Sequence, residues 1–322
     1  MFIILRGRQE VCENENIHHN MHPIIALIIA NIIWGMASPI FKFALTNVPP
    51  FTLAFARFFF AGLLFLPMVI RRWEHMSLRD IGETMAGAFF GITLNISFFF
   101  LGIQKTESIN APIIASAGPV FLFFFSVLFL KEKPVIRIFF GMLIALLGVV
   151  VIIISPLVFS SSTFALGALE GNIFLVIATI GSIFYPLFQK NVLRRISPLQ
   201  ITCLSFLISS ITFLPPAIPE WKSWSISQLN VAGWTGILFG VFFSSALAYG
   251  LYAFGVSKIK VQEVGLFTYI DPVAALLVAA PLLGEYPTIW FFIGSFLVFF
   301  GILIAEKRIH YHPIYIVRKK TI

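Results

Sequence analysis

The sequence is poor in charged residues, which make up 11% of its 322 positions. Soluble globular domains carry about a quarter of their residues as charges. Hydrophobic residues make up 59% of this chain, and its mean hydropathy is +0.95. This composition excludes a soluble enzyme domain, a disordered chain and a nucleic-acid-binding module.

Residues that build catalytic and metal sites are also scarce. The chain has two Asp residues, Asp80 and Asp271, and two Cys residues, Cys12 and Cys203. An Asp-rich metal-diphosphate motif, a disulfide framework, a Cys/His metal site and a catalytic triad are therefore not expected. No Gly-Lys pair occurs, so a P-loop is excluded as well. We expect no enzyme activity, no cofactor and no metal site.

Long apolar runs occupy most of the chain. Each run is long enough to cross the hydrocarbon core of a bilayer as a helix, which needs about 20 residues. Pro, Gly and Ser mark most of the connections between them. The sequence predicts ten transmembrane helices at 24–45, 51–70, 83–104, 111–130, 137–155, 168–188, 199–216, 231–255, 264–283 and 289–306.

Basic residues lie almost entirely on one side of these predicted spans. If the N-terminus is inside, 18 of the 22 Lys and Arg residues fall in inside segments, and only Lys105 and Lys222 fall outside. The other two, Lys42 and Arg57, fall within spans. This bias predicts a multi-pass protein of the cytoplasmic membrane with both termini in the cytoplasm. The net charge of +8 then reflects topology and requires no nucleic acid.

The second half of the chain repeats the first. A shift of 153 residues aligns 87–148 with 240–301 and gives 15 identities in 62 positions. The composition alone predicts about five identities by chance. A repeat of this kind is typical of transporters and indicates a duplicated carrier. Five spans in each half place the halves in opposite orientations. The prediction is an all-α integral membrane fold of two inverted five-helix repeats, at 24–155 and 168–306, between cytoplasmic tails at 1–23 and 307–322. Met21 directly precedes the first span and is a candidate start.

Several short motifs recur in a fixed order along the two halves. They are Trp34-Gly35 with Lys42, Arg57-Phe58, Pro119 with Glu132, Pro272 with Glu285, and the glycine pairs Gly141/Gly148 and Gly294/Gly301. In this order the chain resembles the EamA-type transporters of the drug/metabolite transporter superfamily, in their ten-helix form. The resemblance covers about 24–306. It implies an exporter or exchanger of amino acids, metabolites or drug-like compounds, with a central cavity lined by spans 1, 3, 4, 6, 8 and 9.

Asp271 is the clearest candidate for a coupling residue. It lies near the middle of the ninth span, where charge is costly and usually functional. A carboxylate in a low-dielectric cavity suits a proton relay or a cation site. The following residue, Pro272, frees a backbone carbonyl for a ligand. A structural Asp271, hydrogen-bonded to its neighbours, is the alternative.

Two basic residues within spans are candidates for binding an anionic substrate. Arg57 could hold a carboxylate in bidentate fashion, or it could pair with helix-end carbonyls or extend to the outer interface. Lys42 lies three residues from the predicted outer end of its span, so it could attract an anionic substrate or extend to the outer interface. Arg57 and Asp271 differ in depth by six residues, or ~9 Å, so we do not expect them to form an ion pair.

Aromatic and amide side chains complete the predicted substrate site, with Trp34, Asn95 and Tyr269 as the main candidates. Aromatic rings hold apolar or cationic solutes, although packing within the bundle is the alternative for each residue. The repeated residues Pro119, Glu132, Pro272 and Glu285 are predicted to have gating or structural roles.

The sequence therefore predicts a secondary active transporter that works by alternating access, with proton linkage as an option. Its partners would be a small-molecule solute, the lipid bilayer and protons. One alternative is a nucleotide-sugar or organophosphate exchanger of the same superfamily. Another is a non-transporting membrane scaffold or receptor.

Overall fold

The computed structural model describes residues 23–118, 121, 136–159, 163–193, 195–258 and 265–306, and every regular element in these ranges is a helix. The elements in chain order are α1 (Pro23–Ala44), α2 (Pro50–Arg71), α3 (Leu78–Ala88), η1 (Phe89–Leu94), α4 (Asn95–Lys105), α5 (Asn110–Ser116), α7 (Ile136–Phe159), α8 (Thr163–Val192), α9 (Pro198–Glu220), η2 (Ile226–Gln228), α10 (Val231–Leu238), η3 (Phe239–Leu247), α11 (Ala248–Lys258), η4 (Gly265–Ile270), α13 (Asp271–Leu283) and α14 (Ile289–Glu306).

Most of these helices are apolar enough to lie in a membrane. Six segments have the length and composition of a membrane span, namely Pro23–Ala44, Pro50–Arg71, Leu78–Lys105, Leu166–Gln189, Pro198–Glu220 and Val231–Tyr252. Shorter apolar helices occur at Phe139–Ser155, Phe267–Leu283 and Ile289–Ile304. The predicted all-α membrane fold is confirmed. The fourth predicted span begins as α5, and its remainder, with Pro119 and Glu132, lies outside the described residues.

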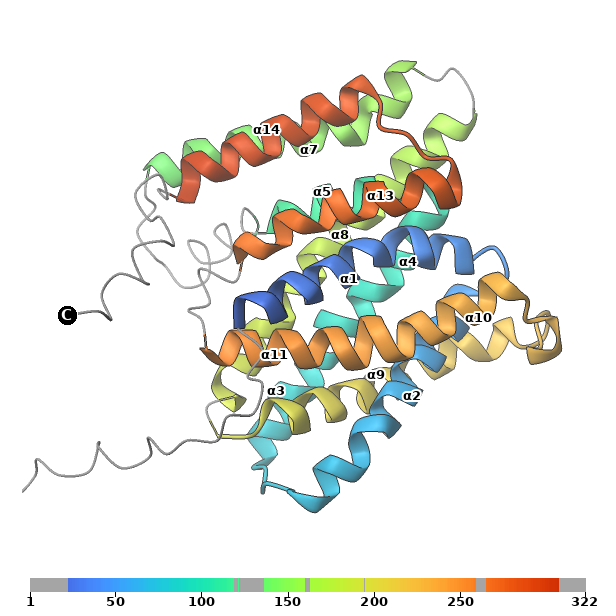
Figure 1. Ribbon diagram of the computed structural model, residues 1–322, viewed down its shortest axis with the longest axis vertical. Helices are drawn as coiled ribbons and strands as arrows, with labels where there is room; N and C mark the ends of the chain where they lie inside the picture. Colours follow the sequence, from blue (N-terminus) through green and yellow to red (C-terminus); the bar gives the residue numbers. More distant parts are fainter. Residues whose placement is uncertain are drawn as a thin grey trace, which may run out of the picture.

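Helices from equivalent positions in the two halves of the chain pack against each other. Figure 1 shows α7 beside α14 at one edge of the bundle and α2 near α9 at the other. The α7–α14 pair is very close, because a Cβ atom added at Gly148 would lie 2.5 Å from the carbonyl oxygen of Gly294. Glycine permits such a close backbone approach between membrane helices. In Figure 1, α1 begins and α14 ends at the same, left-hand end of the bundle.

The α2–α9 pair carries the same contact at both ends, with the roles exchanged. The Glu220 carboxylate, at the end of α9, accepts hydrogen bonds from the backbone N–H groups of Phe51 (3.1 Å) and Thr52 (2.7 Å) at the start of α2. At the other end, the Glu74 carboxylate, just after α2, accepts one from the N–H of Ser197 (2.5 Å) at the start of α9. Each carboxylate satisfies free donors at the positive end of a helix. This exchange is what an inverted repeat requires.

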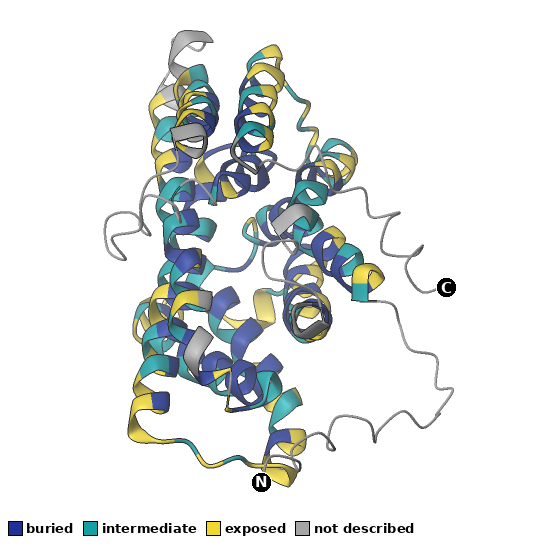
Figure 2. Cartoon of the chain, turned by 90° about the vertical axis from the view of Figure 1, so that its left-hand side faces the viewer, coloured by how far each residue is buried: buried dark blue, intermediate teal, exposed yellow. Residues whose placement is uncertain are grey.

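The burial pattern fits a bundle whose outer surface faces lipid. Phe41, Phe58, Phe100, Phe206 and Phe213 are completely buried inside the bundle. Large apolar side chains such as Leu277, Ile211 and Phe296 are exposed on helix faces, and exposed positions lie along the outer sides of the helices in Figure 2. On a soluble protein, apolar faces of this extent would mark a site of contact with a membrane or a partner. Here they belong to the apolar spans.

Two of the long spans contain a stretch of π-helix at matching places in the repeat. η1 covers Phe89–Leu94, and the 153-residue shift places it on 242–247, inside η3. π-Helical turns within α-helices are uncommon and occur frequently at functional sites. The η3 segment supplies Ser244 and Ser245 to the centre of the bundle, where both are buried.

Candidate functional site

One end of the bundle is held by an ionic cluster, which we call the Lys42–Glu285 latch. The Nζ atom of Lys42, near the end of α1, donates to Oε1 of Glu285 and to the carbonyl oxygen of Thr106, both at 2.6 Å. The other carboxylate oxygen, Oε2 of Glu285, accepts from the backbone N–H (2.7 Å) and the hydroxyl (2.6 Å) of Ser108. The latch therefore joins α1, the α4–α5 loop and the α13–α14 loop.

The loop that carries Ser108 is itself fixed by a buried polar network. The Thr106 hydroxyl donates to Oδ1 of Asn172 at 2.8 Å, and Asn110 Nδ2 donates to the same atom at 3.2 Å. Asn172 Nδ2 in turn donates to the Ile152 carbonyl at 3.2 Å. Because Asn172 lies in α8 and Ile152 in α7, the latch is connected to both helices of the adjoining layer.

Glu107 is a second carboxylate beside the latch, in the same loop. Burial raises the pKa of Glu107, and the negative charge of Glu285 raises it further, while Lys42 opposes both effects. Two carboxylates therefore compete for one ammonium group. The Glu285 carboxylate holds it, because its side chain is only 9% exposed and it also receives the two Ser108 hydrogen bonds.

Arg57 is buried in the middle of the bundle and is 3% exposed. Its Nε donates to the Ser245 hydroxyl at 2.8 Å, and its Nη2 donates to the Ser244 hydroxyl at 3.0 Å. The guanidinium carbon lies 4.8 Å from the ring centre of Phe41 and 4.7 Å from that of Phe58. No carboxylate pairs with Arg57 in the part of the chain that the structure describes. The side chain does not extend to the outer interface.

Trp34 and three tyrosines form an aromatic cluster next to Arg57. The Trp34 Nε1 atom donates to the carbonyl oxygen of Ser244 at 3.1 Å, so Trp34 and Arg57 bind the same serine. The Trp34 ring lies 5.2 Å from that of Tyr249 and 5.0 Å from that of Tyr252. Tyr249 also packs edge-on against Tyr185 at 6.4 Å. These distances are those of favourable aromatic pairs.

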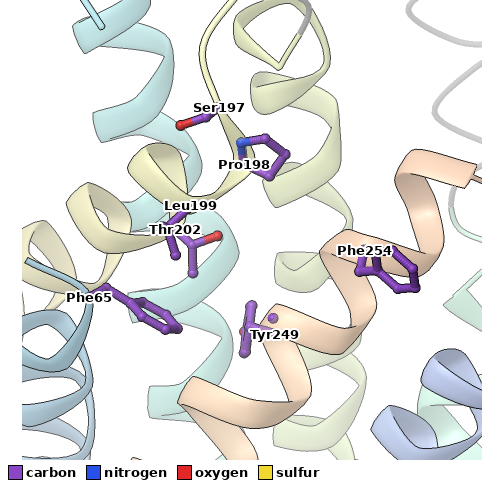
Figure 3. Close-up of a pocket in the computed structure, with 8 residues that line it drawn as sticks. Phe65, Ser197, Pro198, Leu199, Thr202, Tyr249 and Phe254 are labelled. Carbon is purple, nitrogen blue, oxygen red and sulfur yellow. The ribbon is translucent and has the colours of Figure 1, made fainter. Parts of the chain in front are cut away.

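A cavity of about 320 Å³ adjoins this cluster. Figure 3 shows it between the start of α9 and the face of α11, with Tyr249 at its inner wall and Phe254 further along α11. It lies toward the end of the bundle where α9 begins, which we call the Ser197 face. A small solute needs a cavity of roughly this size or larger. The lining residues are Phe65, Ser197, Pro198, Leu199, Thr202, Tyr249, Gly250 and Phe254.

Asp271 lies where η4 becomes α13, against α1. A Cβ atom added at Gly35 would lie 2.5 Å from the carbonyl oxygen of Asp271, so the two backbones touch. Within the described residues, Oδ1 of Asp271 has no hydrogen-bond partner. No ion pair joins Asp271 to Arg57 among these residues. On α1, Gly35 contacts Asp271, whereas Phe41 contacts Arg57 on another face.

The structure brings together some of the predicted site residues and separates others. Lys42 meets Glu285, and Trp34 meets Arg57 through Ser244. Asn95 Nδ2 donates to the Ala178 carbonyl at 2.6 Å and so connects α4 to α8. Tyr269 packs edge-on against Phe299 at 5.4 Å. Pro272 is the first residue after Asp271 in α13. Pro119 and Glu132 lie outside the described residues.

Four further polar residues are notable, although they were not among the predicted site residues. They are Ser108 and Thr106 in the latch, Asn172 beneath it, and Asn31 in α1. Asn31 and Asn172 are amides within apolar runs, which is a signal that the sequence offered. Ser108 and Thr106 lie in a short loop, and nothing in the local pattern distinguishes them from other loop residues.

Comparisons with known proteins place the chain in one family. The profile described as "EamA-like transporter family" matches residues 21–154 and 169–306. An uncharacterized transporter of Archaeoglobus fulgidus is 28% identical over 88% of this chain and 98% of its own length. The uncharacterized transporter YetK of Bacillus subtilis is 27% identical over 88% of this chain and 87% of its length. A solved structure described only as "Crystal structure of protein" aligns with a TM-score of 0.62 and 17% identity over 90% of this chain and 98% of that chain, and so shares the fold.

Proposed function

Because the chain belongs to the EamA-like transporter family, a family of multi-pass membrane transporters, we propose that it carries a small amphipathic solute by alternating access. It acts as an exporter or exchanger. The proposal rests on one observation: an ionic latch closes one end of the bundle, and the cavity lies toward the other end. A carrier must close one side of its site whenever the other side is open.

The Lys42–Glu285 latch provides the closure in this proposal. It joins α1 and the α4–α5 loop of the first repeat to the α13–α14 loop of the second through charge-assisted hydrogen bonds of 2.6 Å. Opening this end requires the two repeats to separate, which breaks the latch. Glu285 thus has the gating role, and Lys42 is its partner rather than a solute ligand.

The distribution of basic residues supports an orientation for this state. The inside segments hold 18 Lys and Arg residues, and the Lys42 end of the bundle is the outer side in that topology. The latch then closes the chain to the outside of the cell membrane. The cavity at the Ser197 face lies on the cytoplasmic side, where an exporter collects its solute.

The side chains around the cavity support a solute with an apolar body and an acidic group. The rings of Trp34, Tyr249 and Tyr252 offer apolar and aromatic contacts. The Arg57 guanidinium shares Ser244 with Trp34 and has no carboxylate partner within the described residues. A buried cation favours an approaching carboxylate and disfavours a second cation.

Counterflow in proteoliposomes tests the proposed function. Vesicles containing the purified chain are loaded with a pool of unlabelled amino acids and small organic acids, and each labelled solute is added outside at trace concentration. A carrier accumulates its labelled solute transiently above equilibrium, because exchange is faster than net flux. Accumulation of one solute class supports the proposal. The proposed solute class is wrong if correctly folded protein accumulates no solute of this pool. The carrier function is wrong if the protein also exchanges no solute of an extended pool.

A further inference from the structure

Two buried oxygen atoms, one in α1 and one at the start of α13, lack hydrogen-bond donors. In the part of the chain that the structure describes, neither Oδ1 of Asn31 nor Oδ1 of Asp271 has a hydrogen-bond partner. Asn31 is completely buried, and both side chains lie in apolar helices. A buried polar atom without a partner costs about 1–3 kcal/mol, so such atoms in a native protein call for a ligand or an ordered water.

The orientation of the Asn31 amide is fixed by its other contact. Its Nδ2 donates to the Leu27 carbonyl oxygen at 2.8 Å. A carbonyl accepts and does not donate, so the nitrogen must face Leu27 and the oxygen must face away from it. The unpartnered atom of Asn31 is therefore an acceptor, as is the unpartnered atom of an ionised Asp271.

The packing of α1 on α13 brings these two residues to the same side. Gly35 contacts the backbone of Asp271, and Lys42, two turns further along α1, reaches Glu285 just beyond the end of α13. The two helices thus run in the same direction. Asn31 precedes Gly35 by four residues and lies on the same face of α1. It is therefore level with the last turn of η4, immediately before Asp271.

The backbone is irregular at this level. The 3₁₀-helix η4 ends at Ile270 and the α-helix α13 begins at Asp271. Pro272 gives no N–H to the preceding turn. Discontinuous helices near the membrane centre are where transporters combine carbonyl and side-chain oxygens to bind small cations. Within the described residues no group of three His, Cys, Asp or Glu side chains could hold a transition metal.

We infer that Asn31 and Asp271 bind a sodium ion where α1 meets the η4–α13 junction. The ion neutralises a carboxylate within the membrane, where an isolated charge is costly. It also satisfies both acceptors at once. A proton on Asp271 would neutralise the same carboxylate, but it would give no stabilisation that is specific for Na⁺. As the coupling ion of a carrier, this site rests on the proposed function. Sodium binding itself does not.

Thermal unfolding of the purified full-length chain tests the site without any solute. The melting temperature is measured in NaCl, KCl and choline chloride at equal ionic strength and constant pH. A ligand that binds only the folded state raises the melting temperature in proportion to the logarithm of its concentration above Kd. We expect a rise with Na⁺ that K⁺ and choline do not reproduce. Asp271→Asn and Asn31→Ala should each abolish the rise, and direct binding of ²²Na⁺ by equilibrium dialysis should be lost with it.

Ser295→Ala is the matched control. Ser295 in α14 is also buried, and its hydroxyl has no partner within the described residues, so its removal should leave the sodium effect unchanged. The inference is overturned if Na⁺ gives the wild-type chain no specific stabilisation or if both site variants keep it. None of these results depends on solute counterflow, so a failed sodium site and a failed carrier function are distinguished.

Discussion

The environment of Arg57 shows how neighbouring side chains can stabilise a buried positive charge inside a membrane bundle. Its guanidinium donates to two serine hydroxyls of η3 and lies between the rings of Phe41 and Phe58. Only a planar fork of N–H groups can reach both hydroxyls while it stacks on aromatic rings. Arg57 thus connects α2 to the π-helical segment of the eighth span, close to the cavity.

Arg57→Lys should therefore impair the protein although the charge is kept. An ammonium group on a flexible stem cannot make both serine contacts, and each hydrogen bond to a charged group contributes about 1.5–3 kcal/mol. We expect a lower melting temperature and slower counterflow. Ser245→Ala, which removes one of the two contacts, should give a smaller loss. A lysine variant as stable and active as the wild type would show that the fork geometry is unimportant.

The raised pKa of Glu107 predicts that the stability of the folded chain depends on pH. Its pKa is raised in the folded chain by burial and by Glu285, so the folded state holds its proton more tightly than the unfolded state. Stability is therefore greater below the ordinary pKa of a glutamate and falls as the pH rises through the raised value. Glu107→Gln removes this loss. Melting curves across this pH range should converge at low pH, with the variant more stable than the wild type above it. Identical pH profiles would contradict the repulsion between Glu107 and Glu285.

At the scale of elements, helix contacts depend on small residues at the points of closest approach. Gly35 permits α1 to touch the backbone of Asp271, and Gly148 permits α7 to touch Gly294 of α14. Lipid tails are as apolar as the helices, so close packing and polar contacts, rather than hydrophobic burial, drive the association of membrane helices. A methyl group at such a point separates two helices.

Gly35→Ala should separate α1 from α13 and disturb both the latch and the Asp271 junction. The added Cβ would lie 2.5 Å from the carbonyl oxygen of Asp271, which is backbone and cannot rotate away. We expect a clear fall in melting temperature and in counterflow. Gly82→Ala in α3 is the control, because its Cβ meets no atom within 4 Å and alanine favours helix. Equal behaviour of the two variants would contradict the close crossing.

At the scale of the whole molecule, the latch and the cavity occupy opposite ends of a bundle built from two repeats. Repeat-equivalent helices pack together, and Glu220 and Glu74 make exchanged contacts at the two ends of the α2–α9 pair. The two ends of a bundle with this symmetry are related to each other. An alternating-access carrier opens only one of them at a time.

Weakening the latch should therefore reduce access to the cavity from the other side. Gly250 lines the cavity, and a side chain there meets open space. In a chain with both native cysteines replaced by alanine, Gly250→Cys should react with an impermeant maleimide from the Ser197 face in inside-out vesicles. Adding Glu285→Gln should slow this labelling several-fold, because removal of one charge-assisted contact shifts the population toward the other state.

Glu170→Gln provides the control for that experiment. Glu170 pairs with Lys105 at 2.7 Å, but both side chains are about half exposed, and such pairs contribute little. It makes the same change of charge and should leave the labelling rate unchanged. Faster labelling after Glu285→Gln, or an equal effect of both changes, would show that the latch does not control access to the cavity.

The sequence by itself determined the membrane fold, the repeat and the family. Hydropathy identified the segments that enter the membrane. The 153-residue shift, which aligns Glu132 with Glu285, identified the repeat. Both properties are local or periodic, so they can be read along the chain. The same reasoning selected Lys42, Glu285, Trp34, Arg57 and Asp271 as unusual residues, because polar groups are conspicuous in apolar spans.

Only the tertiary structure decided which of these residues meet. Lys42 binds Glu285, 243 positions away, and Arg57 binds Ser244 and Ser245. Asn95 connects α4 to α8, and Gly35 of α1 touches the backbone of Asp271. The physical reason is that hydropathy fixes which helices enter the membrane but not their neighbours or rotation. Those are set by close contacts such as Gly35 on Asp271 and by a few polar pairs, which join residues far apart in the chain.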